Sequence, residues 1–128
     1  MRRLGLGLLL LALVASGAQK KRRALEILVV ETAVRRGEGI ITVDGKVRNT
    51  GEKPIQGLTL LFDFLAPGRQ VMTTQKIQME EPVLAPGQEA VYRGALTDPV
   101  RSVRYRFHAA DEAGRDVRVD NAGPFPIE

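Results

Sequence analysis

The chain has 128 residues, enough for one domain, and its 44% hydrophobic and 27% charged residues are typical of a protein that buries a core. It has no cysteine, which excludes disulfides, thiolate metal sites and thiol nucleophiles. The net charge of +4 comes from six basic residues before residue 24, since the other 13 face all 15 acidic ones, and this argues against a basic nucleic-acid-binding domain.

The N-terminus has the pattern of a secretory signal peptide. Arg2 and Arg3 precede an apolar run over residues 4–14, and small residues follow at Ser16 and Ala18. A run of eleven apolar residues suits a signal peptide, whereas a membrane span needs roughly 20. We predict a signal peptide over residues 1–18, cleavage after Ala18, and export to the periplasm or the extracellular space.

A basic segment over residues 19–24 follows the predicted cleavage point. Its charges are those of Lys20, Lys21, Arg22 and Arg23. Positive charge on the translocated side opposes export, so an uncleaved N-terminal anchor is the alternative to cleavage. Such a run also attracts anionic lipid, at about 1 kcal/mol per charge near a membrane surface. Membrane contact is expected only through this segment or an uncleaved signal.

From residue 25 onward, apolar residues recur with a period of two, which predicts strands. The first strand is expected over about 25–34 and ends at the polar turn 35–39. The second, over 39–49, turns alternate apolar residues toward one face. Both strands therefore have one buried face and one solvated face, as in antiparallel sandwiches and barrels.

The connection NTGEKP, residues 49–54, separates the second strand from the next. Asn49 and Gly51 tolerate left-handed backbone, so we expect the chain to leave the sheet there. Pro54 has no N–H to donate to a ladder and is expected where the next strand begins. The connection therefore predicts a crossing between strands at the rim of a sandwich.

The same alternation continues in the segments 57–64 and 102–109, GLTLLFDF and SVRYRFHA. In the first, Asp63 is expected on the outer face; in the second, Arg104, Arg106 and His108 are. Two LAPG copies, at 65–68 and 84–87, predict turns in which proline fixes φ and glycine accepts a positive φ. The last eight residues, NAGPFPIE, are expected to form a proline-interrupted tail or edge strand.

These patterns predict an all-β domain over residues 25–128: an immunoglobulin-like antiparallel β-sandwich of about seven strands with a Pro-rich C-terminal tail. No segment carries a helical stripe with caps. The expected core consists of inward-facing apolar residues: Val43, Val47, Leu58, Leu60, Phe62, Phe64, Val91 or Tyr92, Val103, Tyr105, Phe107, Val117 and Val119.

A set of turn and core residues between about 40 and 107 matches a known pattern. These residues form a G-x-V-x-N strand end, a G-x-x-P turn, an L-x-P-G turn and a following aromatic position: Gly45, Val47, Asn49, Gly51, Pro54, Leu84, Pro86, Gly87 and Tyr92. The region resembles the FxLYD-type domains of exported prokaryotic proteins, although residues 62–66 read Phe-Asp-Phe-Leu-Ala and lack the Tyr-Asp pair. The resemblance implies an immunoglobulin-like sandwich without catalytic residues, acting as an interaction or assembly module outside the cytoplasm.

Catalytic and metal-binding patterns are weak. Ser102 and His108, the one histidine, would stand roughly 20 Å apart along a strand, too far to form a nucleophile–base pair. A copper site of Met72, Met79 and His108 is disfavoured, because both methionines are better explained as core fillers. The aromatic residues fall mostly on core faces, which argues against single-strand nucleic-acid binding. We predict no enzyme activity and no cofactor.

The most distinctive surface feature is an outward row of basic residues, Arg104, Arg106 and His108, with Arg101 and Arg93 expected nearby. It is either an anion- or partner-binding stripe, since arginine pairs with carboxylate and phosphate, or a solvated strand face paired with acidic residues. We predict a non-catalytic protein-interaction or assembly module of the cell envelope, whose partner is an envelope or extracellular protein. The alternative is a surface accessory protein that binds anionic lipid or polysaccharide through the basic segment and this row.

Overall fold

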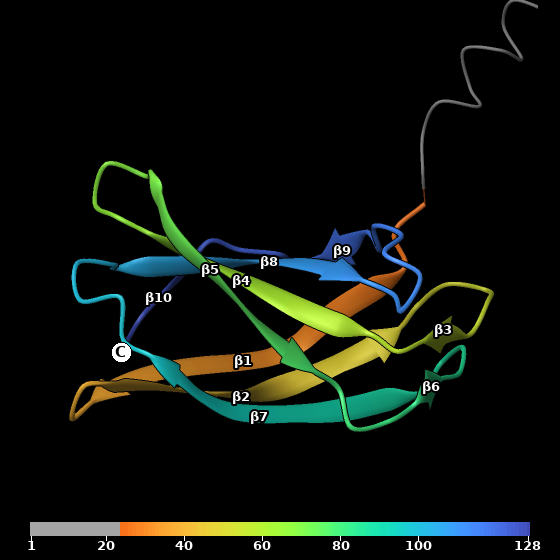
Figure 1. Cartoon of the computed structure of the whole chain (residues 1–128). Helices are drawn as coiled ribbons and strands as arrows, with labels where there is room; N and C mark the ends of the chain where they lie inside the picture. The colour runs from red at the N-terminus through yellow and green to blue at the C-terminus, as the bar shows by residue number, and fades with distance from the viewer. Residues whose placement is uncertain (1–23) are drawn as a thin grey trace, which may run out of the picture.

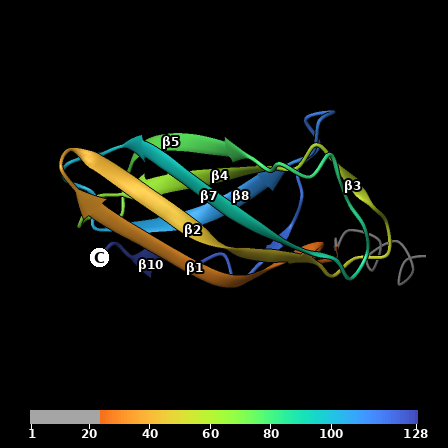
Figure 2. The same ribbon diagram turned by 90° about the horizontal axis from the view of Figure 1, so that it is seen from below.

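Two four-stranded sheets face each other in the computed structural model, which describes residues 24–128 (Figures 1 and 2). The predicted signal peptide and residues 19–23 of the basic segment lie outside the described residues. Six strands are long: β1 (Ile27–Gly37), β2 (Ile40–Asn49), β4 (Thr59–Leu65), β5 (Val71–Gln78), β7 (Glu89–Thr97) and β8 (Arg104–Ala110). Four have two residues each: β3 (Ile55–Gln56), β6 (Val83–Leu84), β9 (Val119–Asp120) and β10 (Phe125–Pro126).

The first sheet has the order β7-β2-β1-β9, the second has β10-β8-β4-β5, and β3 and β6 pair separately. Hairpins β1–β2 and β4–β5 therefore lie in opposite sheets, while β7 returns to β2 and β8 returns to β4. This arrangement of two packed sheets, with no helix in the described residues, confirms the predicted immunoglobulin-like sandwich. The pairing is antiparallel except between β1 and β9, which run parallel.

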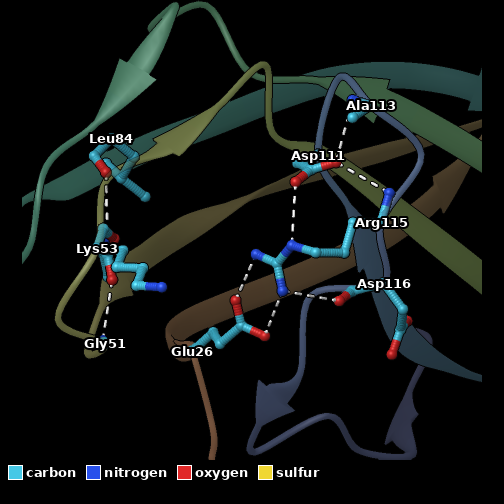
Figure 3. A network of polar contacts seen from close by, with 9 residues as sticks. Glu26, Gly51, Lys53, Leu84, Asp111, Ala113, Arg115 and Asp116 are labelled. Atoms are coloured by element: carbon cyan, nitrogen blue, oxygen red, sulfur yellow. Dashed lines mark hydrogen bonds and ion pairs between the residues drawn. The ribbon is translucent and has the colours of Figure 1, made fainter.

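The chain leaves the first sheet at Asn49, as the sequence predicts, and side-chain hydrogen bonds of Asn49 stabilise the turn. Asn49 is fully buried, and its amide nitrogen donates to the carbonyls of Lys53 and Leu84, each at 2.9 Å. Its side-chain oxygen accepts the Gly51 N–H at 2.9 Å, so the side chain replaces lost backbone partners (Figure 3). Neither residue has a positive φ, so the left-handed backbone that both residue types tolerate is not used at this point.

The two LAPG turns differ from each other. Gly87 has a φ of 80°, which confirms the prediction for the second copy. In the first copy the prediction is wrong, because Arg69 takes the positive φ, 69°, in place of Gly68. The hydrogen bond that closes the turn is the same in both copies: the Arg69 N–H donates to the Ala66 carbonyl at 2.8 Å, and the Gln88 N–H donates to the Ala85 carbonyl at 3.0 Å.

The core confirms most of the predicted set. Phe62 is fully buried at its centre, and its ring lies 4.8 Å from that of Phe107 and 5.9 Å from that of Tyr92. Two assignments are wrong: Val103 is 40% exposed and Met72 is 41% exposed. Val103 precedes the first residue of β8, and Met72 is left without a partner at the irregularity where Thr73 pairs with Phe64 and Val71 with Leu65. Of the pair left open, Tyr92 is buried and Val91 is exposed; Val117 is buried, and Val119 packs against the core from a partly exposed position.

A glycine within β2 makes room for one of the core rings. The hydroxyl of Tyr92 donates to Thr32 Oγ1 at 2.8 Å, and the Tyr105 hydroxyl shares the same oxygen at 2.8 Å. A Cβ at Gly45 would lie 2.6 Å from Cζ of Tyr92 and nearer still to the Glu31 carbonyl oxygen. Glycine at this position is therefore required for the ring that joins the two sheets.

The C-terminal segment resolves the tail-or-strand alternative in favour of an edge strand. Phe125 and Pro126 pair with β8, and the Ile127 and Glu128 N–H groups donate to the carbonyls of Val103 and Val34. The segment first passes along β1 as β9 before it returns to β8.

Candidate functional site

The predicted basic row lies where the sequence places it, along the outer face of β8. Tyr105 and Phe107 are buried, so Arg104, Arg106 and His108 alternate with them and point away from the core. The structure does not extend this row to the other candidates. Arg101 lies in the β7–β8 loop, and Arg93 lies on β7 in the opposite sheet.

The carboxylate of Asp63 holds two members of the row. It lies on β4, opposite Arg106, and is only 6% exposed, so its predicted outer face is correct but that face is not solvated at this point. It accepts hydrogen bonds from Thr74 Oγ1 at 2.6 Å and from Arg106 Nε at 3.1 Å, and contacts His108 Nε2 at 2.7 Å. Burial by itself would raise the pKa of the Asp63 carboxyl, but these hydrogen bonds and the charge of His108 together lower it.

Strand register adds a fourth basic residue to this face. Leu61 of β4 stands opposite His108 of β8 on one side and opposite Lys76 of β5 on the other. Residues directly opposite in an antiparallel ladder share a face, so Lys76 lies on the outer face with the row. We call this set the basic face: Lys76, Arg104, Arg106 and His108, arranged around Asp63.

The guanidinium of Arg106 is both fixed and available. Its Nε is committed to Asp63, and neither terminal nitrogen has a hydrogen-bond partner among residues 24–128. Lys76 and Arg104 likewise have no carboxylate within 4.0 Å in that part of the chain. A planar donor fork fixed on a rigid sheet, with two further cations beside it, binds a carboxylate or another planar anion.

An open groove of about 460 Å³ adjoins the basic face. It lies along the part of the C-terminal segment that leaves β8 and pairs with β1 as β9. The segment returns to β8 at Ala122, whose carbonyl accepts the Phe107 N–H at 2.9 Å. The groove is lined by residues of β8 and of this detour: Arg106, Phe107, His108, Asp116, Val117, Arg118, Val119 and Ala122. The groove therefore continues the basic face from Arg106 and His108 on β8 to residues 116–122 of the C-terminal segment.

The catalytic and metal candidates do not come together. Ser102 is buried in the turn before β8, and its hydroxyl donates to the Pro99 carbonyl at 2.6 Å. The prediction that it is a solvated residue on the same strand as His108 is wrong, because β8 begins only at Arg104. Within the described residues, no group of three His, Cys, Asp or Glu side chains is placed to hold a metal ion. Across the same residues, no helix is long and apolar enough to cross a membrane.

The comparisons with known proteins support the fold and no function. No family model and no curated protein sequence matches the chain. Among solved structures, IrmA from Escherichia coli is similar with a TM-score of 0.52 and 14% identity, over 84% of this chain and 99% of that one. The alkylpurine DNA glycosylase AlkC from Pseudomonas fluorescens, bound to DNA with an abasic-site analogue, matches with a TM-score of 0.43 and 14% identity, over 83% of this chain and 31% of that one. The likeness to IrmA shows a shared sandwich fold alone.

Three residues of the site escaped sequence reasoning: Asp63, Thr74 and Lys76. Asp63 could be placed on an outer face from its alternation with Phe62 and Phe64. Its partners could not, because the pairing of β4 with β5 and β8 depends on the register of strands that the sequence does not specify.

Proposed function

We propose that the chain is a non-catalytic protein-interaction module of the cell envelope or the extracellular space, and that it binds an acidic partner protein through the basic face. Export is supported by the signal-peptide pattern of residues 1–18, and the module class by the resemblance to FxLYD-type domains. The single observation that carries the binding site is the arginine fork of Arg106, whose Nε is anchored on a buried carboxylate while its terminal nitrogens face outward.

The lack of a nucleophile beside His108 in the described residues supports a binding role over a catalytic one. His108 presents Nε2 to Asp63 at 2.7 Å, so the pair is a structural contact on a sheet face. Among residues 24–128 the imidazole of His108 forms a hydrogen bond with Asp63 alone, so no hydroxyl nucleophile is placed for it to activate. Rigid presentation of cations lowers the entropy cost of binding and favours recognition.

The test is capture of a partner by the full chain, immobilised through its C-terminus, from an envelope extract. The variant is the double substitution Lys76→Gln with Arg106→Gln, and its fold is checked by circular dichroism. The matched control is Arg93→Gln, because Arg93 is also an exposed strand arginine but lies in the other sheet. We expect one protein to be retained by the parent and the control and lost from the double variant.

The alternative, an accessory that binds anionic lipid or polysaccharide, gives a different result. Under that alternative the chain would be retained on phosphatidylglycerol-containing vesicles in a salt-dependent manner, and neutralisation of Lys20 to Arg23 would abolish retention. Capture that is equal for the parent and the double variant would contradict the basic face as the binding site.

A further inference from the structure

The three loops at one end of the sandwich expose apolar side chains. This end gathers the β1–β2 turn, the β4–β5 hairpin loop and the β7–β8 loop, on the left in Figure 1. Of the eight large hydrophobic residues exposed in the described domain, five lie in or beside these loops: Ile40, Val71, Met72, Val100 and Val103. Val100 is the most exposed of the eight, at 78%. We call this region the loop end.

Backbone contacts place these side chains close together. Val71 pairs with Leu65, and the Val103 N–H donates to the Leu65 carbonyl at 2.9 Å, so Val71 and Val103 flank one residue. The Asp98 N–H donates to the Gly39 carbonyl, which brings the β7–β8 loop to the turn beside Ile40. Val71 therefore lies near Val103, and Ile40 lies near the loop that carries Val100, in contrast to scattered surface hydrophobics, which are common on folded proteins.

The turn that carries Val100 is held rigidly. Its outer residues are joined by the Ser102 N–H, which donates to the Pro99 carbonyl at 2.7 Å. Arg36 of β1 donates from Nε to both carboxylate oxygens of Asp98 at 2.9 Å, and from Nη2 to the Ser102 carbonyl at 2.9 Å. Ser102 is 1% exposed, so the foot of the turn is buried while Val100 and Arg101 stand at its tip. A loop that is fixed before binding loses little entropy when it binds.

The charges at the loop end are not balanced by the chain itself. Arg69, Arg101 and Arg104 have no carboxylate within 4.0 Å among the described residues, and Glu38 is the exposed acidic residue in these loops. At the opposite end, Arg115 is paired with both Glu26 and Asp111 (Figure 3). Val100 and Arg101 stand together at the tip of their turn, and an exposed apolar side chain beside an unpaired arginine is complementary to an acidic segment that carries apolar side chains.

We infer that the loop end is a docking surface for an acidic segment of a partner protein, with the apolar side chains of that segment packed against Val100 and its carboxylates paired to Arg101 and Arg69. This rests on the proposed function as an interaction module and adds a contact outside Lys76 and Arg106. A protein is favoured over a membrane because the exposed residues are short aliphatic ones. Membrane-anchoring loops use aromatic side chains, and in the described domain Phe62, Phe64, Tyr92, Tyr105 and Phe107 are buried in the core.

The test uses the full chain labelled with ¹⁵N and a synthetic peptide, Glu-Glu-Leu-Leu-Glu-Glu, capped at both ends. We expect saturable amide shift changes, with a dissociation constant below about 1 mM, that are largest in residues 65–72 and 98–104. Val100→Ser and Arg101→Gln should each weaken binding about tenfold or more. The matched controls are Val91→Ser and Arg93→Gln, which alter an exposed valine and an exposed arginine of β7 and should leave binding unchanged.

Three results would overturn the inference: no saturable shift, equal weakening by the control variants, or shifts confined to residues around Arg106 and His108. Binding of the parent to phosphatidylglycerol vesicles that Val100→Ser abolishes would assign the loop end to a membrane and would also overturn it. Loss of peptide binding in Lys76→Gln/Arg106→Gln, with Val100→Ser unaffected, would support the basic face alone. The two proposals can therefore fail separately.

Discussion

Truncation of Phe62 is the most direct perturbation of the sandwich. The residue is fully buried, and its ring lies within 6.3 Å, between centroids, of those of Phe64, Tyr92, Tyr105 and Phe107. Buried Phe→Ala substitutions cost about 3–5 kcal/mol. Because four ring contacts are lost together, each worth about 0.5–1.5 kcal/mol beyond area burial, Phe62→Ala should fall at the upper end of that range. A domain of this size has about 5–15 kcal/mol in all.

The measurement is urea unfolding followed by far-ultraviolet circular dichroism, since the chain has no tryptophan to report by fluorescence. Phe62→Leu retains an apolar side chain and should cost about 1–2 kcal/mol, so a value can be obtained even if the alanine variant does not fold. The control is Leu61→Ala, which removes the adjacent side chain from the outer face of the same strand and should cost about 1 kcal/mol. A Phe62→Ala loss below about 2 kcal/mol, or one no larger than that of Leu61→Ala, would refute the reasoning.

Three further outcomes follow from single residues. Gly45→Ala should destabilise the domain by about 2–3 kcal/mol, since the new methyl meets the ring of Tyr92; an unchanged melting temperature would contradict this. Asp63→Asn should cost about 1–3 kcal/mol at pH 7. The lowered pKa of Asp63 means that its contribution is present above the ordinary value of 3.8 and is lost as the pH falls through the folded-state value, so urea midpoints of parent and variant should converge at low pH. Burial raises the pKa of Tyr92 and Tyr105 above 10.0, so folded-state stability is lost as the pH rises above 10.0. On alkaline titration, phenolate absorbance should therefore appear only together with loss of the dichroism signal. Phenolate formed in the folded protein would contradict this.

The fold could be predicted because each long strand repeats one simple physical constraint. Leu58, Leu60, Phe62 and Phe64 alternate with residues of the outer face, and a period of two has one structural interpretation over such a length. The errors lie at strand ends. Val103 continues the alternation of β8 in the sequence, but it precedes the first paired residue of that strand and is not covered by the opposite sheet.

The rim of the sandwich was predicted in position and not in mechanism. An asparagine with a glycine two residues later favours a turn, and residue types that tolerate positive φ suggested how the chain would turn. The observed solution depends on a carbonyl of Leu84, 35 residues further on, which accepts from the buried amide of Asn49. Local propensity cannot reveal a partner so far along the chain, because a turn with left-handed backbone is equally compatible with the same residues.

For the candidate site, too, the local pattern could be predicted from the sequence and the long-range contacts could not. The row on β8 follows from alternation alone, whereas the identity of its anchor depends on β4 being its neighbour. The loop end depends on three turns that meet only in the folded chain. Its exposed valines could not be distinguished in the sequence from core residues of the same type.

The basic face and the loop end meet at Arg104. The chain passes from the fixed turn around Val100 into β8 within four residues, and Arg104 is the first residue of that strand, opposite Leu65 on β4. Leu65 is buried yet lies outside the main core cluster, because it is on the outer face of its sheet. Its burial there provides apolar support beneath the place where the two surfaces join. On the two proposals above, one acidic partner contacts both regions: it pairs with Arg104 and Arg106 along β8 and packs against Val100 in the loop before that strand.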